Sequence, residues 1–211
     1  AHQRPQANHR KADVDAGLER EVAVTVFFHH VGDGNAQRDF PRTIGTKAGA
    51  VSFSRYQLGE LLPLIEEPGH SELELFLSTA TSDDFQIWGI PSGGAALFRR
   101  VKPGDYWMLL DTPAGGGGFQ YIGKVDLALS GVQEKLSKHL WTESRFPLIF
   151  LMHGQMIDMP WGSFLDYFGY RSSWDPRGLA FGLAKERLRS TPTPDDASYV
   201  RYVTSTFGMS H

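Results

Sequence analysis

The chain has 211 residues, of which 41% are hydrophobic and 12% aromatic, with no cysteine and a formal net charge of −3 at pH 7. This length allows one full domain, alone or with a smaller unit, and the apolar content is ample for a packed core. The lack of cysteine excludes disulfides and thiolate zinc sites, and no apolar run approaches the roughly 20 residues that span a bilayer. With no signal-like segment at its N-terminus, the sequence predicts a cytoplasmic protein without a membrane partner.

The first third of the chain predicts a small α+β unit over residues 21–72, after a polar, disordered leader over residues 1–20. The stretch EVAVTVFFHH is β-branched and aromatic and predicts a strand, and the Gly, Asn and Pro of VGDGNAQRDFPR predict a loop after it. AVSFSRY predicts a second strand. The apolar positions of SRYQLGELLPLIEE recur at helical spacing and predict a helix, although Pro63 disturbs its last turn.

From about residue 73 the sequence pattern changes to short apolar stretches, typical of strands, separated by turn residues. The predicted strands are ELELFLST, FQIWGI, DYWMLLDT, FQYIGKVDLAL and RFPLIFLM. VQEKLSKHLW and PWGSFLDYFGY predict short helices. Five short strands at this spacing favour a small β-barrel with flanking helices over residues 73–190, so the predicted class is α+β. TPTPDD indicates that residues 191–211 form a linker or tail.

The sequence contains no recognisable catalytic pattern: H-E-x-x-H, G-x-S-x-G and P-loop motifs are all missing. Adjacent residues of a strand point to opposite faces, so His29 and His30 are not expected to bind one metal. His153 and Asp158 flank a predicted loop and form a candidate catalytic pair, although a pair that caps the loop is the simpler interpretation. We therefore expect no catalytic residue, metal or cofactor in this chain.

The distribution of charge is uneven, because residues 60–84 hold seven acidic and no Lys or Arg residues, whereas residues 85–190 hold twelve basic and nine acidic ones. A local cationic groove in the second part would bind phosphates. A mixed, solvated surface is the alternative interpretation. The candidate phosphate-binding residues are Arg99, Arg100, Lys102, Lys124, Arg171 and Arg177.

The five tryptophans divide by their positions in the predicted elements. Trp107 and Trp141 lie within a strand and a helix and are expected in the core. Trp88, Trp161 and Trp174 lie at element ends beside Gly or Pro, where a ring can stack on a nucleic-acid base. Core packing is the alternative for each of them, because tryptophan is mostly buried.

Several motifs together resemble the PUA-like superfamily over roughly residues 73–188. They are Trp88-Gly89 after a strand, the glycine-rich stretch behind it, VKPGD leading into YWMLL, then FQYIGKV and LWTESRFPLIFLM. The sequence is most similar to EVE- and YTH-type members, which include the N-terminal reader domains of McrBC-type modification-dependent restriction systems. The resemblance implies a flipped, often methylated base in an aromatic cage, with Trp88 as one wall. The strand expected to supply the second wall has no tryptophan here, so Trp161 or Tyr121 would substitute.

This interpretation predicts a reader of modified bases in nucleic acid, with duplex DNA as its partner and a nuclease or NTPase domain on the same or another chain. Two alternatives remain open: a nuclease or other hydrolase with an unrecognised centre, and an RNA-binding PUA-like protein. The candidate base-binding residues are Trp88, Ser92, Tyr121, Asp158, Trp161 and Trp174.

Overall fold

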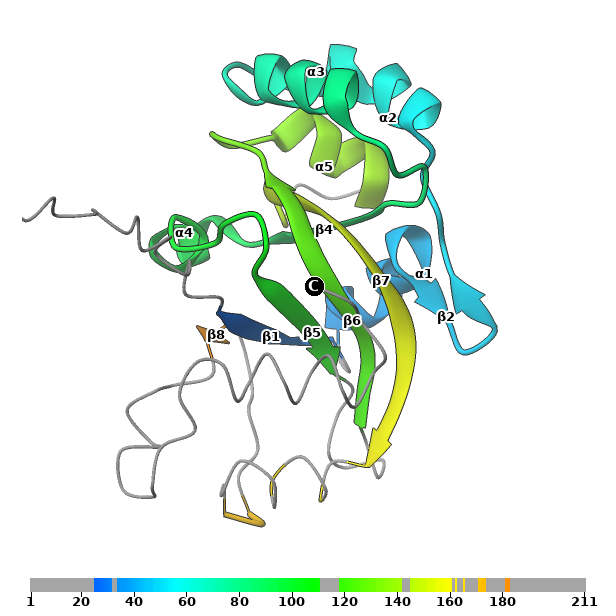
Figure 1. The fold of residues 1–211 in the computed structure, drawn as a ribbon. Helices are drawn as coiled ribbons and strands as arrows, with labels where there is room; N and C mark the ends of the chain where they lie inside the picture. The colour runs from blue at the N-terminus through cyan, green and yellow to red at the C-terminus, as the bar shows by residue number, and fades with distance from the viewer. Residues whose placement is uncertain are drawn as a thin grey trace, which may run out of the picture.

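The chain forms a six-stranded mixed sheet with five α-helices among the residues that the structure, a computed structural model, describes (Figure 1). The described residues are 25–31, 34–110, 118–141, 145–160, 162, 165, 171–173 and 181–182. The strand order is β4-β7-β6-β5-β1-β8. The α+β class is therefore confirmed. Within the described ranges no pairing joins the edge strands β4 and β8, so the predicted closed barrel is not observed.

Four of the five predicted barrel strands are present and form neighbouring members of the sheet. They are β4 (Gln86–Ile90), β5 (Tyr106–Leu110), β6 (Gly118–Ala128) and β7 (Leu148–Pro160). All three pairings among them are antiparallel. The last strand extends well past the predicted end at Met152, which gives β6 and β7 the longest pairing in the sheet.

The sheet continues beyond β5 with β1 (Val26–His30) and β8 (Phe181–Gly182). β1 runs parallel to β5, with Val26 opposite Tyr106, and β8 pairs with the other side of β1 in the antiparallel sense. The strand that opens the predicted N-terminal unit is therefore an inner member of the sheet that holds the predicted barrel strands. The domain boundaries themselves stay a prediction.

Two stretches form helices where the sequence predicted other structure. Residues 31–42 were expected to form a loop, yet helix α1 (Gly34–Thr43) occupies this stretch because Ala36 and Phe40, one helical turn apart, are both buried in the core. Residues 72–79 were expected to form a strand, yet they belong to helix α3 (Gly69–Thr79). The alternation of Glu and Leu there also fits a helix whose inner face carries the buried Leu73.

The remaining elements follow the local sequence signals more closely. Helix α2 (Arg55–Leu61) begins at a capping box, in which Ser54 and Gln57 satisfy each other's backbone amides. Helix α5 (Glu134–Trp141) forms within the predicted helix VQEKLSKHLW. The predicted second strand is reduced to a short hairpin and one bridge from Phe53 to Phe85. The other elements are β2 (Gly45–Thr46), β3 (Gly49–Ala50), η1 (Leu62–Leu64), η2 (Ser92–Gly94) and α4 (Ala95–Phe98).

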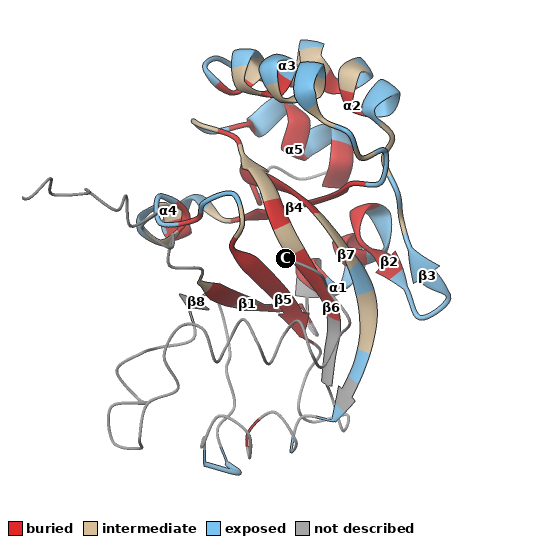
Figure 2. Cartoon of the chain, in the orientation of Figure 1, coloured by how far each residue is buried: buried red, intermediate tan, exposed pale blue. Residues whose placement is uncertain are grey.

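The core lies between the sheet and the helices that pack on it. Helices α2, α3 and α5 gather at one end of the sheet (Figure 1), and buried residues follow the strands and the inner sides of α1 and α5 (Figure 2). Trp107 stacks on Phe27 with ring centroids 5.2 Å apart and contacts Phe150 at 4.6 Å. Trp107 and Trp141 are fully buried, which confirms both as core residues. None of the helices in the described ranges has the length and apolar character that crossing a membrane requires.

We expect Gly154→Ala to destabilise the fold. A Cβ at Gly154 would collide with the backbone of β6 at Ile122 and Gly123, so the loss in unfolding free energy should be about 1–3 kcal/mol. Gly59→Ala is the matched control, because a Cβ there meets open space on α2, and it should stabilise by about 0.4–1 kcal/mol. Urea denaturation of both variants measures the difference; equal stabilities would show that the β6–β7 contact is looser than described.

Candidate nucleic-acid interface

Three of the predicted phosphate-binding side chains stand on one exposed turn between α4 and β5. Arg99, Arg100 and Lys102 are all exposed, and we call residues 99–102 the cationic turn. Its shape is fixed by the buried carboxylate of Asp105, which accepts hydrogen bonds of 2.8 Å from the backbone amides of Lys102 and Thr25. The turn therefore presents its cations from a backbone that is held in place.

The cationic turn is also bound to the centre of the sheet. Gly104, in the left-handed region at φ 94°, donates its amide to the Val125 carbonyl at 2.8 Å. Val125 donates in return to the carbonyl of Asp105 at 2.7 Å. The two residues that flank Val125 on β6 are Lys124 and Asp126, so the cationic turn adjoins the part of β6 that carries these charges.

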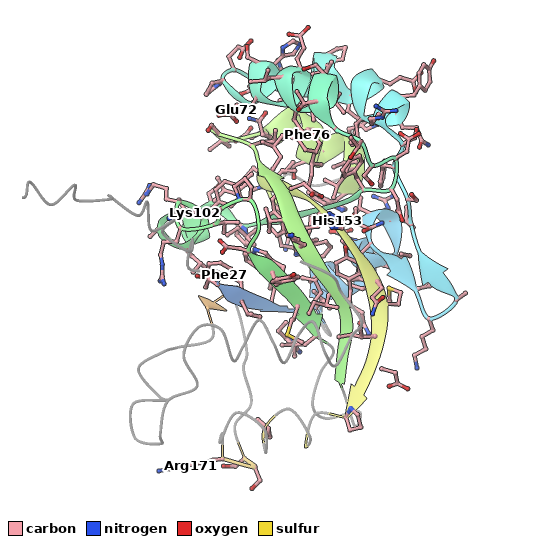
Figure 3. The ribbon with its side chains drawn as sticks, viewed as in Figure 1. Phe27, Glu72, Phe76, Lys102, His153 and Arg171 are labelled. Carbon is pink, nitrogen blue, oxygen red and sulfur yellow. The ribbon has the colours of Figure 1, made fainter. Side chains whose placement is uncertain are left out.

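Asp126 lines an open cleft of about 400 Å³. It is bounded by the C-terminal end of α3, the loop over residues 80–85, β6 and β7, and Figure 3 shows Phe76 on α3 and His153 on β7. Phe76 and Phe85 form an edge-to-face pair with centroids 5.5 Å apart. The lining residues are Phe76, Thr79, Ala80, Thr81, Ser82, Phe85, Asp126 and His153.

The polar part of the cleft is a histidine–carboxylate pair. Both carboxylate oxygens of Asp126 lie 2.8 Å from Nδ1 of His153. An ionised carboxylate only accepts, so Nδ1 carries a proton and Nε2 remains for a ligand. The hydrogen bond to Asp126 raises the pKa of His153, and burial opposes this rise. The predicted pair of His153 with Asp158 is wrong: Asp158 is exposed further along the same strand, and His153 binds Asp126 instead.

His153 belongs to a row of side chains that crosses the sheet. Tyr106 on β5 lies opposite Lys124 on β6, and Lys124 lies opposite His153 on β7. Residues directly opposite one another share a face of the sheet, so these three side chains are neighbours. Lys124, one of the predicted phosphate-binding residues, is only half-exposed. Sequence reasoning missed Asp126, Phe76 and Phe85 as site residues, because only the strand register and the position of α3 bring them to His153.

Trp88, the predicted wall of the base pocket, is fully buried. Its Nε1 donates a 2.9 Å hydrogen bond to Nδ1 of His29. The rings of Phe146, Trp141 and Phe40 surround it at centroid distances of 5.7, 5.9 and 6.1 Å. Burial, followed by the charge of a neighbouring histidine, lowers the pKa of His29 to about 4, so Nδ1 is free to accept this bond at neutral pH. A base could reach Trp88 only if a neighbouring ring moved, and its role as a wall stays a prediction.

Tyr121 is likewise inside the protein and belongs to a polar network. Its hydroxyl donates to Oε1 of Gln86 at 2.7 Å, and the amide of Gly154 donates to the same oxygen at 3.0 Å. The side-chain amide of Gln86 donates to the Val51 carbonyl at 3.0 Å and to Asp84 at 2.9 Å. Every polar atom of this buried glutamine is thus satisfied, and the network links β4, β6 and β7.

The other predicted site residues are scattered or lie outside the described ranges. Ser92 on η2 and Asp158 near the end of β7 are both exposed, as is Arg171. Trp161, Trp174 and Arg177 lie outside the described residues. The structure thus brings Arg99, Arg100 and Lys102 together on one exposed turn, whereas the base-binding set is not gathered in the described ranges.

Comparison with known proteins gives one informative match. No protein-family model matches the chain, and no curated protein matches its sequence. Among solved structures, the N-terminal domain of McrB from Thermococcus gammatolerans, bound to m5C DNA, matches with a TM-score of 0.56 at 14% identity. The match covers 85% of this chain and 98% of that domain. The resemblance to McrBC-type N-terminal domains is therefore confirmed at the level of the fold.

We expect Trp88→Ala to lower the free energy of unfolding by about 3–5 kcal/mol, because it removes a large, fully buried ring and leaves His29 without its donor. Leu75→Ala is the control, since Leu75 is 69% exposed and its loss should change stability by less than about 0.5 kcal/mol. Thermal and urea denaturation measure both. An unchanged stability in Trp88→Ala, together with weaker binding of modified DNA, would instead place Trp88 in a base pocket.

Proposed function

We propose that this chain reads modified DNA: it binds duplex DNA that carries a methylated base, with that base turned out of the helix. The observation that carries the proposal is the match over 85% of the chain to an McrB N-terminal domain bound to m5C DNA. A shared fold alone does not establish a function, so the proposal also rests on the chemistry of the site. In this proposal the chain is the targeting module of a restriction system and works with a nuclease or NTPase domain on the same or another chain.

The cationic turn supports DNA as the partner. Three exposed cations on a backbone fixed to β6 can neutralise adjacent phosphates, and such contacts position a duplex without reading its sequence. Lys124, Arg171 and Arg177 are proposed to extend this contact. The net charge of −3 does not oppose it, because the charge is unevenly distributed: the cationic turn holds three cations and no acidic residue, whereas residues 60–84 hold seven acidic residues and no Lys or Arg.

Base recognition requires aromatic surface and polar groups that can contact the edge of the base. The residues proposed for this from the sequence remain Trp88, Ser92, Tyr121, Asp158, Trp161 and Trp174. The burial of Trp88 and Tyr121 means that these two would act only after a rearrangement of the core.

One feature favours a hydrolase as the second candidate function. An imidazole held by a carboxylate, as His153 is by Asp126, is the arrangement that a general base needs, and hydroxyl groups line the same cleft. Cleavage of DNA or another ester by the isolated chain, abolished by His153→Gln, would favour this second function over the first.

Binding to a set of duplexes that differ at one base tests the proposed function. The duplexes carry unmodified cytosine, 5-methylcytosine or N6-methyladenine, and fluorescence anisotropy measures the affinity at one fixed salt concentration. We expect one modified duplex to bind about 10–200-fold more tightly than its unmodified counterpart, the range that one methyl-sized difference allows. Equal affinity for all duplexes would contradict a reader function, and tighter binding to structured RNA would favour the RNA-binding alternative.

Replacing Arg99, Arg100 or Lys102 by Ala should weaken binding to modified and unmodified duplexes equally, because phosphates are common to both. Each lost contact should also reduce the slope of log affinity against log salt by roughly 1. Lys47→Ala is the matched control, as Lys47 is an exposed cation on the β2–β3 turn, away from α4 in Figure 1. An unchanged slope in all three variants would place the DNA elsewhere on the molecule.

A further inference from the structure

The cleft between α3 and β7 has the size and lining of a site for a flat ring. Its volume of about 400 Å³ lies within the range of small-ligand pockets, roughly 300–1,000 Å³, and is sufficient for one nucleotide. Phe76 and Phe85 give it aromatic surface, and His153 gives it a polar group 43% exposed. Asp126, which lines the cleft, follows Val125, whose backbone bonds to Gly104 and Asp105 just after the cationic turn.

The charges around the cleft favour a base over a phosphate. Asp126 forms part of its wall, and Asp84 lies beside Phe85 at its edge, with a carboxylate oxygen that accepts from Ser52 at 2.6 Å and from Gln86 at 2.9 Å. A phosphate in the cleft would meet these carboxylates, whereas a neutral ring with an amino group would meet acceptors. The phosphates of the same DNA would meet the cations of residues 99–102.

We propose that this cleft receives the base that leaves the duplex, and that it selects a base with an amino group beside a ring nitrogen on its Watson–Crick edge. Cytosine and adenine have this edge, whereas thymine and guanine present a ring N–H there. The inference rests on the proposed function and locates its base pocket at residues that differ from those expected from the sequence.

The hydrogen-bond donors and acceptors in the cleft determine which bases it selects. Protonated His153 offers one donor, Nε2–H, to an acceptor on the base. The oxygens of Asp126 and the hydroxyl of Thr79, whose hydrogen is donated to the Phe76 carbonyl at 3.1 Å, are acceptors. A ring nitrogen flanked by an amino group complements this set, and a methyl group on the ring would add contact with the two phenylalanines.

The selection depends on pH because Nε2 donates only while His153 is protonated. Asp126 and Asp84 raise the pKa of His153, while burial and Lys124 lower it, and the rise prevails. The α3 residues of the cleft are not titratable. The proton is therefore fully present below the ordinary histidine pKa and is lost as pH rises through the raised value. Binding to phosphates by arginine has no such dependence.

The experiment measures the ratio of affinities for a duplex with one 5-methylcytosine–guanine pair and the same duplex with a thymine–adenine pair at that position, from pH 5.5 to 8.5. The two bases share the methyl group and differ at the Watson–Crick edge. For the wild type, we expect this preference to fall as pH rises. His153→Gln should reduce this preference about tenfold or more at low pH and remove its pH dependence, because the Nε2–H donor is lost. His70→Gln is the matched control, because His70 lies on α3 near Glu67 and outside the cleft.

A second variant tests the cleft without altering the ion pair. Thr81 is exposed at the rim, so Thr81→Trp should fill the cleft and remove the preference while leaving the melting temperature and the salt slope unchanged. If the wild type binds every duplex equally, the proposed function and this base pocket are both wrong. If the wild type prefers modified DNA but both variants keep that preference, the function stands and the base binds elsewhere.

Discussion

Gly123 on β6 and Gly154 on β7 lie directly opposite each other, and the ring of Tyr121 takes the space that side chains at these positions would need. The tyrosine hydroxyl and the Gly154 amide then meet on one oxygen of Gln86, which links the edge strand β4 to both. This close approach fixes the register of the two longest strands. Because Lys124 and His153 are the next pair in that register, the geometry of the cleft and the anchor of the cationic turn follow from it.

The two histidine environments show how one residue type serves opposite purposes in this fold. His29 is sealed among aromatic rings, where burial keeps it neutral and makes it an acceptor for Trp88. His153 lies at an open surface, where Asp126 favours its charged form. The first arrangement stabilises a dry core and the second offers a polar group to a ligand. The degree of exposure and the hydrogen-bond partner therefore distinguish the structural histidine from the candidate functional one.

The sequence predicted those elements whose signals are local. Apolar runs such as FQIWGI and YWMLL, bounded by turn residues, became strands, and the Ser54–Gln57 capping box marked the start of α2. The sequence-based prediction failed where tertiary contacts determine the secondary structure. In α1, the Gly, Asn and Pro residues suggested a loop, but the burial of Phe40 in the core stabilises a helix. The pair of His153 and Asp126 depends on strand register across 27 residues, which no local pattern encodes.

The position of β1 has a consequence for any fragment of this chain. A piece that began at residue 73 would keep β4 to β7 but lose the strand between β5 and β8. The amides and carbonyls of β5 that now bond to β1 would form an open edge beside buried aromatic surface, the arrangement that promotes self-association of sheets. The amide of Thr25, a donor to Asp105, would go with it and leave the support of the cationic turn incomplete. The opening residues of the sheet thus support the later half, because they pair with the edge of β5 and help to hold Asp105.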